Sequence, residues 1–218
     1  MRTVCRSMAC MTVALFGATT TVNATDQSAI PGQIVAICAD MTLDYAAMLA
    51  ELSSLGLQSA PDAALPAIQA VCEAVNISEG LRDPLSVKAQ ARIREETLRC
   101  FKSRGISDGS VVETGGLASA DAGIIVAVRL VEFAATPSSV TCHLATYAPY
   151  KIDTTNITAK PEIESSNHLG SQQIWMPTPL VRFVLQPNPG TFLDSLRPDQ
   201  PMASSAALVI RPDTPGLM

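Results

Sequence analysis

The sequence is poor in aromatic and histidine residues. Its 218 residues include one Trp, three Tyr, five Phe and two His. Sugar-binding clefts usually need exposed aromatic rings, so this composition disfavours a carbohydrate-binding protein. A Ser-His-acid hydrolase would need His143 or His168 as its base, and no serine lies in a G-x-S-x-G motif. We therefore read both histidines as structural or solvated side chains, and keep His168 as the candidate base or metal ligand of a dispersed site.

Motifs for cofactors and metals are also missing. Gly115-Gly116 belongs to no P-loop or dinucleotide fingerprint, and the chain has no H-x-H, H-E-x-x-H or C-x-x-C pair. Glu95 and Glu96 are adjacent on a predicted helix, so the two carboxylates point in different directions and cannot flank one substrate. The sequence predicts no catalytic, cofactor-binding or metal-binding residue.

Only the first residues contain a long uncharged apolar run. Residues 8–22 follow Arg2 and Arg6 and lead into Val22-Asn23-Ala24, a small-x-small pattern that signal peptidase accepts. The run of 15 residues is shorter than the roughly 20 apolar residues of a membrane span, although a retained anchor is the alternative. Residues 1–24 are thus predicted to be a signal peptide, and residues 25–218 a single soluble domain without a membrane span, in the periplasm or secreted.

Basic residues are outnumbered in the predicted mature chain. Removing residues 1–24 takes away two arginines, which leaves 13 basic against 20 acidic side chains and a net charge of −7. Nucleic acids and anionic lipid headgroups are bound by clustered Lys and Arg. This charge therefore argues against nucleic acid and membrane surfaces as partners.

Four cysteines follow the predicted cleavage site: Cys38, Cys72, Cys100 and Cys142. An even number in an exported chain indicates two disulfides, and four buried free thiols are the alternative. Three pairings are possible. We favour Cys38–Cys72 and Cys100–Cys142, because each would join neighbouring predicted elements.

Helical periodicity dominates the first half of the chain. Apolar residues spaced between Met41 and Leu55 predict a helix that starts at Asp40 or Thr42 and ends at Gly56. A second helical segment opens at Pro61-Asp62 and carries Ile68, Val71, Cys72 and Val75 on one face, followed by a loop over residues 76–82. A third, longer helix runs from Asp83-Pro84 to Gly105.

Strand patterns dominate the second half. Residues 124–133 are apolar on both faces, which predicts a central strand, and residues 140–147 alternate as its partner with His143 on the wetter face. Short strands are expected at residues 111–114, 172–176 and 206–210, while residues 180–185 fit either a helix or a strand. Residues 115–123 and 153–169 are predicted to be flexible loops, and the C-terminal tail is irregular. The predicted fold class is α+β, with two to three helices packed on a small, mostly antiparallel sheet.

The order of these elements resembles a layout found in small exported bacterial domains of unknown function. A helix ends at Gly105-Ile106, two strands follow, and then a strand containing Trp175, over roughly residues 86–198. This resemblance implies no activity and no site residue. We expect a non-enzymatic binding or envelope-assembly domain whose partner is another envelope protein, with a small secreted hydrolase acting near His168 as the alternative. Trp175 is expected in the core or at its rim, and the alternative is that its flanks, Ile174 and Met176-Pro177, form an exposed apolar patch for a partner.

Overall fold

The structure is a computed structural model that describes residues 29–82, 109–134, 136–155, 160–175, 181–188 and 202–213. Within these ranges helices and strands form an α+β fold, as the sequence predicts. The helices are α1 (Ile30–Ala39), α2 (Tyr45–Ser54), the short 3₁₀ helix η2 (Pro61–Ala63) and α3 (Ala64–Arg82). The strands are β1 (Gln58–Ser59), β2 (Gly109–Ala118), β3 (Ile124–Phe133), β4 (Ser139–Thr146), β5 (Ile163–Asn167), β6 (Gly170–Trp175), β7 (Val181–Pro187) and β8 (Ser205–Pro212).

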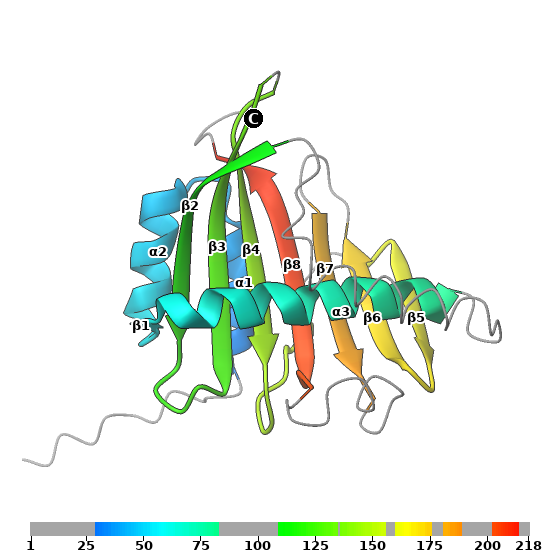
Figure 1. Ribbon diagram of the computed structural model, residues 1–218. Coiled ribbons are helices and arrows are strands. Elements are labelled where there is room, and N and C mark those ends of the chain that lie inside the picture. Colours follow the sequence, from blue (N-terminus) through cyan, green and yellow to red (C-terminus); the bar gives the residue numbers. More distant parts are fainter. Residues whose placement is uncertain are drawn as a thin grey trace, which may run out of the picture.

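All eight strands belong to one antiparallel sheet in the order β1-β2-β3-β4-β8-β7-β6-β5. The first four strands form one half, and the last four return from the opposite edge, so that β4 and β8 meet in the middle (Figure 1). The predicted strand at residues 124–133 is β3, and its first six residues are buried. Burial on both faces explains why its sequence is almost continuously apolar.

Helix α3 crosses one face of the sheet and packs on it through small side chains (Figure 1). Its buried residues Ala67 and Ala70 cluster with Ala127 and Ala145 of the central strands. Methyl groups on both sides allow the helix backbone to approach the sheet closely at native packing density. Farther along, Ile77 and Leu81 cluster with Leu169, Ile174, Leu185 and Ala206.

Helices α1 and α2 pack on the opposite face and bury the larger core. In α2, Asp44 caps the N-terminus by accepting a hydrogen bond from Ala47 N, and Gly56 ends the helix at φ +89°. Glycine tolerates this left-handed conformation, so the predicted helix end is confirmed, whereas the cap is Asp44 rather than Asp40 or Thr42. Among the helices described, none combines the length and apolar character that crossing a membrane requires.

Arg211 connects β8 to the end of α1. The side chain is 1% exposed, and its guanidinium donates to the carbonyl oxygens of Cys38 (3.1 Å), Pro212 (2.9 Å) and Leu43. Burial lowers the pKa of Arg211, and the neighbouring carboxylates oppose that effect. Carbonyl groups in the last turn of a helix lack intrahelical donors, so the bond to Cys38 satisfies a buried carbonyl at the end of α1.

The disulfide pairing differs from the one expected. Cys38 of α1 is bonded to Cys142 of β4, which excludes both Cys38–Cys72 and Cys100–Cys142. The reason lies in the layers, because α1 and α3 cover opposite faces of the sheet and the side chain of Cys142 faces α1. Cys72 of α3 is also disulfide-bonded. Cys100 lies outside the described residues, as do the predicted signal peptide and the helix expected over residues 83–105.

Several predicted loops are regular structure. Residues 76–82 continue α3, and residues 163–167 form β5. Gly115 and Gly116 lie inside β2, where the N–H of Ala60 donates to the Gly116 carbonyl at 2.8 Å. A Cβ on Gly116 would overlap the Ala60 carbonyl oxygen, so glycine is needed for close approach between two backbones.

Candidate functional site

The face of the sheet opposite α3 is not covered evenly by helices. On this face α1 packs on β4 and β8, and α2 packs on β3. Strands β5, β6 and β7 lie to the side of both helices (Figure 1). The segment that follows β4 runs along this part of the face, where Gln186 of β7 donates to the carbonyl oxygen of Ile152 at 2.9 Å.

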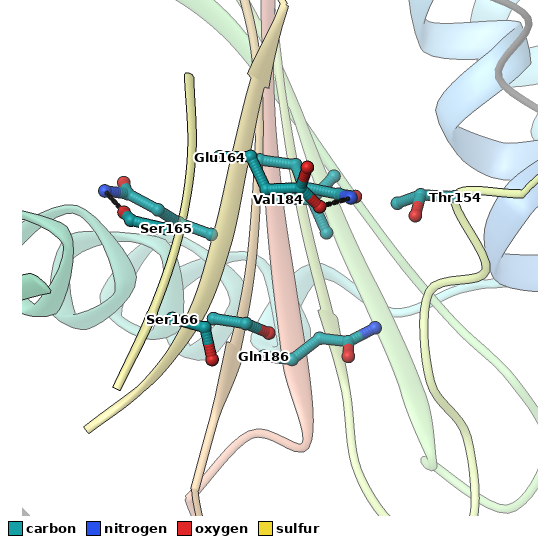
Figure 2. A pocket seen from close by; sticks show the side chains of 9 residues that line it. Thr154, Glu164, Ser165, Ser166, Val184 and Gln186 are labelled. Carbon is teal, nitrogen blue, oxygen red and sulfur yellow. Dashed lines mark hydrogen bonds between the residues drawn. The ribbon is translucent and has the colours of Figure 1, made fainter. Parts of the chain in front are cut away.

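A hollow of about 140 Å³ lies between this segment and the three strands (Figure 2). We call it the polar hollow, because all of its lining side chains except Val184 carry hydroxyl, amide or carboxylate groups: Thr154, Glu164, Ser165, Ser166, Ser171, Gln172, Gln173 and Gln186. Register places Glu164 beside Gln173 and Ser166 beside Ser171. Since neighbouring strands are about 4.8 Å apart and alternate residues about 7 Å apart, the groups form two rows across three strands.

Only part of the hydrogen-bonding capacity of the polar hollow is used internally. Gln173 Nε2 donates to Glu164 Oε1 at 2.9 Å, which holds the carboxylate against β6. The hydroxyl groups of Thr154, Ser166 and Ser171 have no hydrogen-bond partner among the described residues. Each hydroxyl can donate one hydrogen bond and accept two, so the hollow presents unused donors and acceptors side by side.

The floor of the polar hollow is held from behind by α3. Gln172 is also one of the lining residues, and its amide donates to the Ser165 hydroxyl at 2.8 Å and reaches the Ser78 carbonyl of α3 at 3.4 Å. Gln172 is 1% exposed, and its neighbour Leu185 is fully buried under the same helix. A site on packed strands with a second layer of hydrogen bonds keeps its groups in fixed positions.

His168 does not join the polar hollow. It is exposed at the turn between β5 and β6, beside Asn167, whose side chain accepts a hydrogen bond from Leu169 N. It is not one of the residues that line the polar hollow. Within the described part of the chain, His168 therefore lacks the deep cleft with a buried acid that a general base at this position would need.

His143 lies on the dry face of β4, not on a wetter one. It is 6% exposed beside Ala127 and Leu208, because α3 covers this side of the sheet. Burial, with a contribution from the nearby Arg129 charge, lowers the pKa of His143 to about 3. Its Nδ1 atom has no hydrogen-bond partner in the described ranges. A neutral imidazole sealed beneath a helix explains the residue as part of the core.

The burial of Trp175 and the spacing of possible metal ligands test the remaining expectations about a site. Trp175 is 2% exposed and belongs to the large core, so the expectation of a core aromatic is confirmed. Its flank Ile174 is also buried, whereas the other residues of the expected apolar patch, Met176 and Pro177, lie outside the described residues. Across the residues that the structure describes, His, Cys, Asp and Glu side chains do not gather in groups of three that could hold a metal ion.

No family model, curated protein or solved structure matches the chain.

Proposed function

We propose that the chain is an exported, non-enzymatic binding domain of the cell envelope, and that its polar hollow binds a polar segment of another envelope protein. One observation carries the proposal: three hydroxyls without a partner among the described residues, three amides and a carboxylate gather in a hollow on a face that α1 and α2 do not cover. A face that had evolved only to remain solvated would not need a fixed second layer of hydrogen bonds beneath it.

The chemistry of the hollow favours a peptide over other ligands. Its volume of about 140 Å³ is below the roughly 300–1,000 Å³ of sites for drug-sized molecules. None of its described lining residues is aromatic, so a sugar would find no stacking surface. The backbone amides and short polar side chains of a peptide carry both hydrogen-bond donors and acceptors. These can pair with the Ser, Thr and Gln groups of the polar hollow. The single carboxylate in this lining, Glu164, favours a ligand that is neutral or positively charged.

Export is supported by the N-terminal sequence and by the cross-links. A disulfide between buried cysteines, such as Cys38–Cys142, is typical of proteins that fold in an oxidising compartment. The leader at residues 1–24 has the charge and cleavage pattern of a signal peptide. Envelope proteins are therefore the expected source of the bound segment.

A capture experiment tests this function. Mature protein carrying Ser166→Arg, which places a long cation in the polar hollow, is compared with the wild type in capture from envelope extract. Ser59→Arg is the matched control, because Ser59 is an exposed serine at the opposite edge of the sheet. We expect Ser166→Arg to lose at least about tenfold of the captured partner, equivalent to about 1.4 kcal/mol, while Ser59→Arg keeps it.

Two results would contradict the proposal. Equal capture by Ser166→Arg and wild type would show that the polar hollow is not the binding surface. A hydrolytic activity of the purified protein that His168→Ala abolishes would favour the alternative of a secreted hydrolase.

A further inference from the structure

A second hollow, of about 200 Å³, opens at one end of the sheet, far along the chain from the polar hollow. It lies where the end of α2 and the start of α1 meet the turn between β2 and β3. Its walls are the aliphatic side chains of Ile30, Leu55, Leu57 and Ile124, and its polar groups include Asp121 and Tyr150. We call it the Asp121 hollow.

The carboxylate of Asp121 is held in place by three hydrogen bonds. The Ser119 hydroxyl donates to Oδ1 at 2.6 Å, Gly123 N donates to Oδ1 at 3.0 Å, and the Tyr150 hydroxyl donates to Oδ2 at 2.7 Å. These bonds, that of Ser119 first, lower the pKa of Asp121 to about 2, so the group is ionised at neutral pH. A carboxylate has about four acceptor positions, so these three bonds leave capacity for a ligand.

The ring of Tyr150 is positioned by the turn beneath it. A Cβ on Gly123 would overlap that ring, so the glycine makes room for the tyrosine to reach Asp121. Gly56, which also lines the hollow, has no atom within 4 Å of the position that a Cβ would take. The acidic oxygen and the phenol oxygen are 2.7 Å apart, close enough for one cationic N–H group to contact both.

We propose that the Asp121 hollow binds a small hydrophobic primary amine in its ammonium form. The aliphatic walls take up the apolar body, since burying its surface in the hollow is favourable by the hydrophobic effect. The ammonium group donates to Asp121 Oδ2 and to the Tyr150 hydroxyl oxygen. Charge decides the class of ligand, because the hollow presents a fixed negative charge and none of its described lining residues is positively charged.

Titration of the mature protein with three matched probes, followed by amide NMR shifts, tests this site. Phenethylammonium, 2-phenylethanol and 3-phenylpropionate share a ring and differ in charge. At low ionic strength, where screening is weak, we expect saturable shifts from phenethylammonium at residues 55–57 and 119–124. The alcohol should bind at least about tenfold more weakly, and the acid should not bind. This comparison uses wild-type protein and is independent of the folding of any variant.

Two variants locate the site. Asp121→Asn keeps the shape and the acceptor for Ser119 and Gly123 but removes the charge, and should weaken phenethylammonium binding about tenfold or more. Asp153→Asn is the matched control, because Asp153 also accepts bonds from the residue two positions later but does not line the hollow. Equal affinity for the alcohol and the ammonium, unchanged binding by Asp121→Asn, or the absence of saturable shifts would each overturn the proposal. Loss of amine binding would leave the proposed function of the polar hollow unaffected, since the two hollows share no lining residue.

Discussion

Removal of the Cys38–Cys142 disulfide should cost a large part of the stability of the domain. The bond joins residues separated by 104 positions. In the chain-entropy model, closing a loop of that size is worth about 4.7 kcal/mol at 25 °C. The two residues are only 1% and 2% exposed, so replacing them by alanine also removes buried atoms, at a further cost of about 1 kcal/mol. The expected total of about 4–6 kcal/mol compares with a typical stability of about 5–15 kcal/mol.

Equilibrium urea unfolding of the Cys38→Ala/Cys142→Ala variant measures this loss, with fluorescence of the buried Trp175 as the signal. A companion variant, Cys38→Ala/Cys142→Val, refills part of the volume that the sulfur atoms leave. It should recover only the smaller packing contribution, because the cross-link is still missing. A total loss below about 2 kcal/mol in the alanine variant would refute the reasoning, since it would mean that closing this loop hardly constrains the unfolded chain.

Four further substitutions test the packing and the charges. Gly116→Ala should lower the free energy of unfolding by about 2 kcal/mol or more, because its Cβ would strike a backbone carbonyl, whereas Gly32→Ala in α1 should be neutral or stabilising. Arg211→Leu should lose about 2–5 kcal/mol in the same urea assay, since it leaves buried carbonyls without a donor. His143 has a folded pKa of about 3, below the unfolded value near 6.5, so its contribution to stability is complete above pH 6.5 and is lost as the pH falls towards 3. Wild-type stability should therefore fall relative to His143→Leu by about 1.4 kcal/mol per pH unit between pH 6 and pH 4, and a difference that does not vary with pH would contradict this assignment.

Elements with strong periodicity and clear ends can be predicted from the sequence. Helix α2 combines an apolar face with Gly56 at its end, and β3 is apolar on both faces because helices cover both. Helix α3 is predicted only in part. Its sheet-facing side is rich in alanine, a residue that gives little hydrophobic contrast, so periodicity assigns the larger Val75 to the packed face although it is 38% exposed.

The disulfide pairing could not be predicted because it depends on the layer in which each helix lies. Sequence proximity favours Cys72 as the partner of Cys38, but α1 and α3 cover opposite faces of the sheet. The expected environment of His143 is wrong for the same reason. Alternation along β4 indicates that one face is more polar, and only the position of α3 shows that this face is dry.

The candidate site could not be predicted from the sequence either. Polar residues make up β5 after Ile163, and such a pattern is typical of a loop. The row of Ser166, Ser171 and Gln186 exists only through the register between three strands. The sequence does contain a run of Ser and Gln residues next to a glycine turn. Such a run does not distinguish a binding face from a solvated one, so it does not predict a site.

Site-specific photo-crosslinking tests the central claim most directly. A benzoylphenylalanine residue is introduced in place of Ser171 in the polar hollow, or in place of Ser59 as the control, in the full chain expressed in its own cells. We predict an adduct with an envelope protein from position 171 and not from position 59. Identical adducts from both positions, or an adduct from position 171 with a cytoplasmic protein, would contradict a binding domain that acts outside the cytoplasm through this face.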